Sequence, residues 1–384
     1  MLQILSLLTL VVWLGLFFFW GQFWRVWDFD ADRARFPGLE HWPPVVAVLP
    51  ARNEAQSIAA VVMSLAAQDY AGEFSVVIVD DHSEDGTAEI ARQAAEAAGA
   101  ALRVRVVSAP ELPRGWTGKL WALEAGVNSA PAAEPDFFWF TDADVVHAPD
   151  TLRNLVSNAE SAKLDLVSLM VLLKTESIAE RLLIPPFVYF FLMLYPPRWT
   201  ADSKSRTAGA AGGCVLLRRT SLERAGGLAA VSGEVIDDCA LARAVKRSGG
   251  NIWMGLTRKS ASLRSYSTFS EIRDLIARTA FTQLRYSALL LLGTMLGMAV
   301  TFLLPVVLTF SLSIHVWLFA LGAWCLMTAS FLPTVTFYRL QPIWSPLLPL
   351  AAVFYSVATW LSAFRYWLGR GGQWKGRTQA KRES

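Results

Sequence analysis

The feature that most constrains this chain is the absence of charged side chains from long apolar segments near its two ends. Residues 1–24 contain no Asp, Glu, Lys or Arg, and neither do residues 287–338. A helix of about 20 apolar residues crosses the ~30 Å hydrocarbon core of a bilayer. We therefore predict a transmembrane anchor over residues 1–24. The second segment is long enough for two spans that turn near residues 311–314.

A third apolar segment, residues 340–364, is interrupted by Pro342, Pro346 and Pro349. Residues 287–368 are thus predicted to form a block of two to three spans, followed by a basic tail over residues 369–384. Positively charged tails are normally cytoplasmic. Three spans after a cytoplasmic domain would place this tail outside, so either one proline-interrupted segment dips without crossing, which we favour, or the charge rule fails here.

Composition excludes several classes of protein. Hydrophobic residues make up 54% of the 384 residues and charged residues only 17%, against about 25% charged in soluble domains. This argues against an ordinary cytosolic globule and against disorder. A formal net charge of +3 gives no support for nucleic-acid binding. Three scattered cysteines are too few for a disulfide framework.

The middle of the chain, residues 45–268, has the pattern of a doubly wound α/β domain. Short apolar runs at residues 45–49, 74–79, 102–107 and 137–140 are each followed by a polar loop and, for the first three, by a helical segment. Ligands of such sheets bind at the carboxyl ends of the strands. Residues 269–286 then combine apolar residues at helical spacing with charged residues, four of them between Glu271 and Arg278, which predicts an amphipathic helix on the bilayer surface.

Acidic residues follow two of these predicted strands directly. Asp142 and Asp144 come one residue apart after residues 137–140, an arrangement that suits a hard divalent cation bound to a diphosphate. Residues 80–87 form a second acidic loop, in which Ser83 and Asp85 have turn formation and helix capping as an alternative role. His82 and His147 are assigned to no metal, because a lone histidine beside carboxylates is more often a hydrogen-bonded loop residue.

Taken together, the motifs resemble those of family 2 glycosyltransferases, enzymes with the GT-A fold. The resemblance covers residues 45 to about 250, and with the apolar segments included the chain is most similar to the hopene-associated glycosyltransferases. The motifs that carry it, in chain order, are Pro50-Ala51-Arg52-Asn53-Glu54, Asp80-Asp81-x-Ser83-x-Asp85-Gly86-Thr87, Gly118-Lys119, Thr141-Asp142-Ala143-Asp144 and Asp237-Asp238-x2-Leu241.

The resemblance implies a role for each of these positions. Asp81 would bind the uracil of a UDP-sugar, with Ala51, Glu54 and Lys119 near the nucleotide. Asp142 would face the ribose or the metal, and Asp144 would coordinate a Mg²⁺ or Mn²⁺ that bridges the diphosphate. Asp238 would be the catalytic base.

For Asp237 and Asp238, capping of the helix that follows is the alternative role. Gly212 and Gly213 resemble the glycine-flanked acceptor strand of the family, although packing alone would also explain them. Arg285 is a candidate to neutralise the diphosphate, against an alternative in which it only extends toward the membrane surface. Processive relatives carry Q-x-x-R-W here, whereas residues 282–286 read Thr-Gln-Leu-Arg-Tyr, which argues against polymer synthesis.

We therefore expect a multi-pass enzyme of the bacterial inner membrane with a cytoplasmic catalytic domain. It would transfer one sugar from a nucleotide sugar to a lipid acceptor, a hopanoid being the first candidate. Carotenoid, sphingolipid and polyprenyl-phosphate acceptors, or an inactive sugar-nucleotide-binding scaffold, are the alternatives. The number of subunits stays open. Residues 182–199, rich in proline and aromatic residues, are read either as an interfacial hairpin or as buried core.

Overall fold

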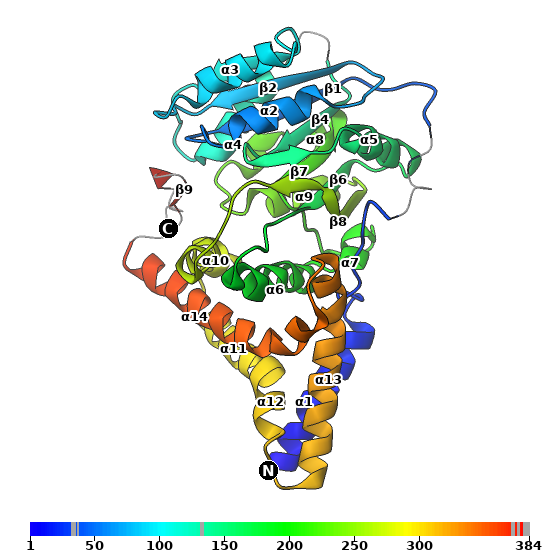
Figure 1. The fold of residues 1–384 in the computed structure, drawn as a ribbon, viewed down its shortest axis with the longest axis vertical. Coiled ribbons are helices and arrows are strands. Elements are labelled where there is room, and N and C mark those ends of the chain that lie inside the picture. The colour runs from blue at the N-terminus through cyan, green and yellow to red at the C-terminus, as the bar shows by residue number, and fades with distance from the viewer. Residues whose placement is uncertain (32–35, 37, 131–133, 370–372, 375–376, 379–384) are drawn as a thin grey trace. The chain divides into compact units, whose positions relative to one another are not determined.

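The computed structural model describes residues 1–31, 36, 38–130, 134–369, 373–374 and 377–378. The chain divides into two compact units (Figure 1). A helical unit comprises Met1–Val26, Lys174–Arg198 and Tyr266–Gly372, and an α/β unit comprises Trp27–Leu173, Trp199–Ser265 and Gln373–Ser384. Most of the predicted basic tail, residues 369–384, lies outside the described residues.

An eight-stranded mixed sheet forms the centre of the α/β unit, with strand order β3-β2-β1-β4-β7-β6-β8-β5. The first four strands of that order run parallel, and β7 is antiparallel to both β4 and β6. The predicted mostly parallel mixed sheet is therefore confirmed. The strands are β1 (Val45–Ala51), β2 (Phe74–Asp80), β3 (Val104–Ser108), β4 (Phe137–Thr141), β5 (Val145–His147), β6 (Leu166–Leu172), β7 (Cys214–Arg218) and β8 (Ile252–Ser262).

Helices cover both faces of this sheet, because its central strands are apolar on both sides. All seven residues of β1 are buried and alternate between two cores. Val45, Ala47 and Leu49 face a core shared with α2, α3 and α5, while Val46 and Val48 face a core shared with α4, α8 and α9. The helices are α2 (Ile58–Ala66), α3 (Thr87–Ala97), α4 (Gly118–Asn128), α5 (Thr151–Ser161), α8 (Arg219–Arg224), η2 (Leu228–Val231) and α9 (Asp237–Arg247).

The strand order identifies where a ligand would bind. The chain leaves β1 toward β2 on one side, and β4 returns to the other side of β1. The crevice at such a reversal, at the carboxyl ends of the strands, is the usual binding site of doubly wound sheets. Ala51, Asp80 and Thr141 end β1, β2 and β4, so the acidic motifs that follow these strands lie at one edge of the sheet.

Helix α4 packs unusually close to the sheet at Gly126. A Cβ atom at this position would lie 2.3 Å from Cγ1 of Val48 and 3.0 Å from Cγ2 of Val79. Because the helix backbone rests directly on β1 and β2, the N-terminal end of α4, which carries Lys119, is held at a fixed distance from the strand ends.

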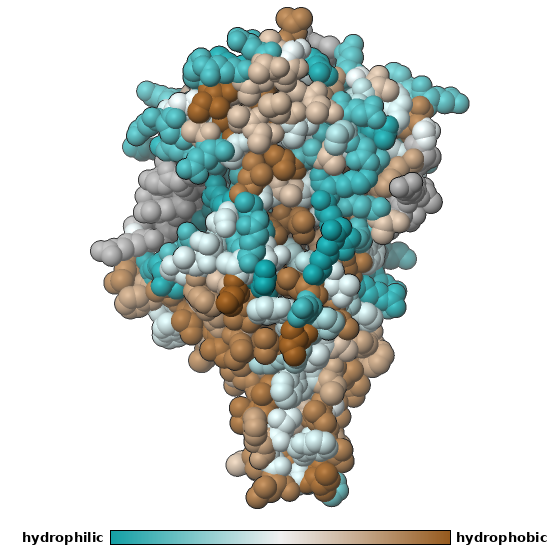
Figure 2. All heavy atoms as spheres, viewed as in Figure 1, coloured by the Kyte–Doolittle hydropathy of each residue, from teal (hydrophilic) through white to brown (hydrophobic). Residues whose placement is uncertain are grey.

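The helical unit contains four helices that are long and apolar enough to cross a membrane: α1 (Leu2–Phe19), α11–α12 (Ala288–Leu308), α13 (Ile314–Phe337) and η4–α14 (Pro342–Trp367). Apolar side chains cover much of the visible surface of these helices (Figure 2). The second is α11 (Ala288–Met298), a π-helical turn η3 (Ala299–Leu303) and α12 (Leu304–Leu308), and the fourth is η4 (Pro342–Leu347) and α14 (Leu348–Trp367). A shorter helix, α10 (Phe269–Gln283), precedes the last three of them.

Helix α6 (Ile178–Leu194) replaces the hairpin that was one alternative for residues 182–199. Pro185 and Pro186 lie inside this helix rather than at its ends. A capping box at Ser177 and Glu180 fixes its first turn. Nine of its residues are buried, so packing compensates for the two amide donors that the prolines lack. The short α7 (Pro197–Ala201) follows.

We predict that Gly126→Ala destabilises the α/β unit, because the added methyl group overlaps Val48. Overpacking of this kind costs about 1–3 kcal/mol of unfolding free energy. The melting temperature of the purified protein measures the effect. Gly38→Ala is the matched control, since a Cβ at Gly38 meets nothing within 4 Å. Equal melting temperatures for the two variants would contradict the close packing of α4.

Candidate active site

The turn between β4 and β5 presents two carboxylates at the edge of the sheet. Strand β4 is buried throughout and ends at Thr141, and β5 begins at Val145. Asp142 and Asp144 occupy the intervening turn, with 34% and 17% of their side chains exposed. Their separation by one residue keeps both charges in the same short loop.

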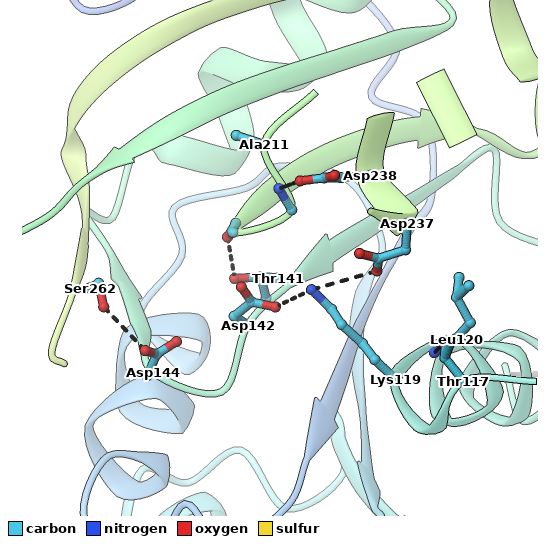
Figure 3. A network of polar contacts seen from close by, with 12 residues as sticks. Thr117, Lys119, Leu120, Thr141, Asp142, Asp144, Ala211, Asp237, Asp238 and Ser262 are labelled. Carbon is cyan, nitrogen blue, oxygen red and sulfur yellow. Dashed lines mark hydrogen bonds and ion pairs between the residues drawn. The ribbon is translucent and has the colours of Figure 1, made fainter. Parts of the chain in front are cut away.

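Lys119 joins this turn to the first turn of α9. Its Nζ lies 2.8 Å from Oδ1 of Asp142 and 3.7 Å from Oδ2 of Asp237 (Figure 3). Burial disfavours the charged ammonium, but the carboxylates of Asp142 and Asp237 outweigh this and raise the pKa of Lys119 above its ordinary value. The lysine is therefore a permanent positive charge between two acidic segments that are far apart in the sequence.

Asp238 is the second residue of α9 and points away from Lys119 toward the backbone that precedes β7 (Figure 3). Its Oδ2 accepts a 2.8 Å hydrogen bond from the amide of Gly212, and its Oδ1 accepts one of 2.7 Å from Cys239. Burial, followed by the charge of Asp237, raises the pKa of Asp238 to about 6. A carboxyl with such a pKa is suited to accept a proton near neutral pH.

Gly212 allows this approach because it has no side chain. A Cβ at Gly212 would lie 3.1 Å from Nζ of Lys119 and 3.4 Å from Oδ2 of Asp238. The N-cap residue of α9 is Ile236, without a side-chain capping bond, so neither Asp237 nor Asp238 occupies the N-cap position considered from the sequence. Asp238 instead accepts a hydrogen bond from the amide of Cys239 within the first turn.

Asp144 belongs to a second cluster of charges. Its Oδ2 lies 3.1 Å from Nε of Arg264 and accepts a 3.2 Å hydrogen bond from Ser262. Nη2 of the same arginine lies 2.8 Å from Oε1 of Glu54. Burial, together with the charge of Asp142, raises the pKa of Asp144. The carboxylates of the turn therefore repel one another and would be stabilised by an additional cation.

The loops after β1 and β2 are hydrogen-bonded to one another. The amide of Asp81 donates a 2.8 Å hydrogen bond to the carbonyl oxygen of Ala51. Nη1 of Arg52 lies 3.6 Å from Oδ2 of Asp81, whose side chain is 1% exposed. Asp81 and Ala51 thus lie together at the carboxyl ends of adjacent strands.

The remaining polar residues of these loops hold the two loops in place. Oδ2 of Asp85 accepts a 2.9 Å hydrogen bond from the amide of Ala55, and its Oδ1 accepts one of 3.1 Å from Thr87 at the start of α3. Ser83 accepts a 3.0 Å hydrogen bond from the amide of Asn53. Ser83 and Asp85 therefore have the structural role that the sequence left as an alternative.

His147 connects the acidic turn to the strand on its other side. Its Nε2 lies 2.8 Å from Oγ1 of Thr141, and its Nδ1 lies 2.8 Å from Oγ of Ser260. Thr141 donates its proton to the carbonyl of Gly213, 3.0 Å away, so we assign the imidazole proton to Nε2. Burial lowers the pKa of His147 to about 3, and the ring is neutral at physiological pH.

The structure brings some predicted site residues into one cleft. Lys119, Asp142 and Asp238 line it together with Asp237 and Gly212. Asp144 and Glu54 are joined to one another through Arg264, and Asp81 and Ala51 lie at the ends of β2 and β1. Arg285 belongs to the helical unit, and its contribution to the site stays a prediction.

Sequence reasoning missed Arg264 and Ser262. The contacts of both residues with Asp144 depend on the antiparallel pairing of β5 with β8, which places Val145 opposite Ser262. Local patterns carry no signal for a pairing between residues so far apart in the chain. The charge of Arg264, shortly before the predicted amphipathic helix, was the only available indication.

Asp142 and Asp144 have the chemistry that a hard divalent cation requires. Within the described part of the chain, no group of three or more His, Cys, Asp or Glu side chains forms a complete ligand set. Two carboxylates from one turn, completed by water and phosphate oxygens, are typical of Mg²⁺ sites. The residues present therefore fit a cation that arrives together with a diphosphate.

The fold and this site define a GT-A domain, and comparison with known proteins identifies the family. The model of the glycosyltransferase-like family 2 matches residues 43–282, more than half of the chain. The chain therefore belongs to glycosyltransferase-like family 2. No curated protein matches the chain.

A solved structure shows the same fold. A mannosyltransferase from Pyrobaculum calidifontis, in complex with GDP-Man and Mn²⁺, is 19% identical with a TM-score of 0.53, and the match covers 93% of this chain and 99% of that one. A glucosyl-3-phosphoglycerate synthase from Mycobacterium tuberculosis, in complex with Mn²⁺ and UDP-glucose, is 20% identical with a TM-score of 0.40, covering 63% and 79%.

We predict that His147→Asn lowers stability most at neutral and alkaline pH. Between about pH 3 and 6.5 the unfolded imidazole binds a proton that the folded one does not. The contribution of the neutral, buried imidazole to the unfolding free energy of the wild type is therefore fully present above about pH 6.5 and decreases as the pH falls. The difference in unfolding free energy between wild type and variant should therefore narrow from pH 8 to pH 5.

Denaturant titrations at pH 8, 6.5 and 5 measure that difference. His41→Asn, at an exposed histidine, is the matched control for loss of an imidazole. A wild-type advantage over His147→Asn that grows on acidification would show that the buried ring is charged in the folded protein.

Proposed function

We propose that this family 2 enzyme is an inverting glycosyltransferase of the bacterial inner membrane. It would transfer one sugar from a nucleotide sugar, with UDP as the expected nucleotide, to a hydroxyl or carboxyl group of a lipid, a hopanoid being the first candidate. The observation that carries the proposal is the position of Asp238. Its carboxyl, with a raised pKa, lines the same cleft as Lys119 and Asp142.

The donor is expected to bind along the carboxyl ends of β1, β2 and β4. Asp81 and Ala51 would contact the base, with Glu54 and Lys119 nearby. Asp142 and Asp144 would hold Mg²⁺ or Mn²⁺, which supplies positive charge to the diphosphate when bound. Lys119 already provides a positive charge 2.8 Å from Asp142, where it can stabilise charge that develops on the departing diphosphate.

Asp238 is proposed to accept the proton of the acceptor group. As the acceptor oxygen forms its bond to the anomeric carbon, the bond from that carbon to the diphosphate oxygen breaks and its electron pair leaves with the nucleotide. Attack opposite the leaving group inverts the anomeric configuration. The hydrogen bond from Gly212 fixes the carboxyl orientation, and a pKa near 6 leaves it deprotonated at neutral pH.

A lipid acceptor is supported by the apolar helices of the helical unit. Four of them are long and apolar enough to cross a bilayer, which would keep the enzyme at the membrane where its acceptor resides. Transfer of one sugar, rather than polymer synthesis, is supported by residues 282–286, where Thr and Tyr stand in place of the first Gln and the Trp of the processive motif.

We predict that Asp238→Asn lowers the rate of UDP release from UDP-sugars at least about 100-fold, because general-base catalysis contributes that much or more. Asp144→Asn should also lower the rate and raise the Mn²⁺ concentration needed for half-maximal activity. Detergent-purified protein, assayed with a lipid extract as acceptor and with and without Mn²⁺, gives both values.

Asp69→Asn is the matched control, since Asp69 forms an exposed ion pair with Arg153. Mass spectrometry of lipids from a deletion strain, complemented with wild type or Asp238→Asn, tests the acceptor class: only wild type should restore the missing glycolipid. Full turnover by Asp238→Asn would refute the base assignment, and absence of turnover in wild type would favour the scaffold alternative.

We predict an acid limb near pH 6 in the pH profile of kcat/KM. Below that pH the carboxyl of Asp238 is protonated and cannot accept a proton, so the rate should fall about tenfold per pH unit. Asp237→Asn should move the limb to lower pH, because after burial the charge of Asp237 is the main cause of the raised pKa. A limb that moves upward in Asp237→Asn would contradict this coupling.

A further inference from the structure

We propose that the segment Pro342–Trp367 re-enters the bilayer without crossing it, and that an exposed apolar face of α14 rests in the leaflet next to α10. The partner of this surface is thus the lipid of one leaflet. The inference concerns the helical unit alone and rests on the proposed membrane association, in which α1, α11–α12 and α13 are the crossing segments.

The depth of α10 is fixed by its charges. Glu271, Arg273, Asp274 and Arg278 all lie in this helix, and Glu271 closes a capping box with Thr268 at its start. Burying four charged side chains in hydrocarbon costs several kcal/mol each. Helix α10 is not among the membrane-span candidates of the described residues. It therefore belongs at the membrane surface, shortly after Ser265, where the chain passes from the α/β unit to the helical unit.

Helix α14 runs along α10 in the same direction. Near the start of both helices, the rings of Phe269 and Phe354 lie 6.1 Å apart. In the middle, the Ser362 hydroxyl donates to the carbonyl of Ala277 and accepts a 3.1 Å hydrogen bond from the amide of Phe281.

The contacts continue to the end of α10. Tyr366 stacks on Tyr286 with ring centroids 4.3 Å apart, and Nη2 of Arg365 lies 2.7 Å from Oδ1 of Asp274. Two helices in contact along the whole length of the shorter one share the same depth. The carboxyl end of α14 therefore lies at the surface where α10 lies.

The start of the segment shows how it enters the membrane. After α13 the chain turns back along that helix, because Nε1 of Trp324 donates a 3.3 Å hydrogen bond to the carbonyl of Pro346. Trp324 precedes the end of α13 by thirteen residues, or about 20 Å of helix. Irregular backbone is tolerated at such depth only inside protein. Within η4, Ser345 beside this contact is buried, whereas Pro342 and Ile343 at the start of η4 are exposed.

A stripe of large apolar side chains marks the partly exposed face of α14, and its last member, Trp367, also contacts Phe281 of α10. The stripe residues are between 45% and 60% exposed and recur at alternating intervals of three and four: Leu350, Val353, Val357, Trp360, Phe364 and Trp367. The opposite face carries small buried residues, including Ala351, Ala358 and Ala363. Two tryptophans on an apolar stripe beside a charged helix suit the interfacial region of a leaflet.

This arrangement also agrees with the rule that positively charged segments are normally cytoplasmic. Three spans after a cytoplasmic domain would violate that rule. With three crossing segments, the N-terminal end of the chain faces the outside, and both the α/β unit and the carboxyl end of α14 face the cytoplasm. Arg365 then lies on the side that positively charged residues prefer. The predicted basic tail, residues 369–384, would follow on that side.

Single-cysteine reporters and a membrane-impermeant maleimide test the proposal in the full-length chain. The background is Cys325→Ala, because Cys214 and Cys239 are buried. The reporters are Glu96→Cys in the α/β unit, Leu312→Cys in the turn between α12 and α13, and Ser384→Cys at the last residue of the sequence. Inverted vesicles should label Glu96→Cys and Ser384→Cys, and right-side-out vesicles should label only Leu312→Cys.

The three reporters separate two kinds of failure. Labelling of Ser384→Cys together with Leu312→Cys would show that Pro342–Trp367 crosses the bilayer and would overturn this inference alone. Labelling of Leu312→Cys together with Glu96→Cys would contradict the crossing of α11–α12 and, with it, the proposed membrane topology.

A full-length fusion to a fluorescent protein that folds only in the cytoplasm provides a second readout, independent of cysteine chemistry. Fluorescence from a C-terminal fusion supports the re-entrant segment. A dark fusion present at normal level in the membrane would refute it.

Discussion

The site depends on the electrostatic balance between acidic and basic side chains at the carboxyl edge of the sheet. Asp142, Asp144 and Asp238 would repel one another if they stood alone. Lys119 neutralises part of this charge from α4, and Arg264 neutralises another part from the residues after β8. The balance is incomplete, since burial and, after it, the charges of neighbouring carboxylates still raise the pKa values of Asp144 and Asp238. Such residual negative charge is suited to bind a cation with its diphosphate.

The packing of the sheet makes this balance possible. Close approach of α4 at Gly126 brings Lys119 to the strand ends, and Gly212 leaves room for both the ammonium and the Asp238 carboxyl. His147 holds Thr141 from the opposite side. Positions with small or buried polar residues therefore determine where the charged side chains lie.

In the helical unit, charged side chains have a different proposed role, which is to keep α10 at the surface of the membrane. Hydropathy alone makes Pro342–Trp367 indistinguishable from the other three candidate spans. Its contacts with α10, in particular the ion pair between Arg365 and Asp274, are the basis for the proposal that its carboxyl end returns to the surface from which the segment entered. The length of an apolar segment is thus a necessary condition for crossing a bilayer and not a sufficient one.

The sequence by itself determined the apolar segments, the α/β class of the middle domain and the acidic motifs after β1, β2 and β4, because these follow from local periodicity and from the position of polar residues at strand ends. Only the tertiary structure decided that Lys119 bridges Asp142 and Asp237, and that Arg264 reaches Asp144 and Glu54. These contacts require pairing between segments far apart in the chain. Such pairing depends on the packing of the whole sheet, which leaves no periodic signal in any one segment.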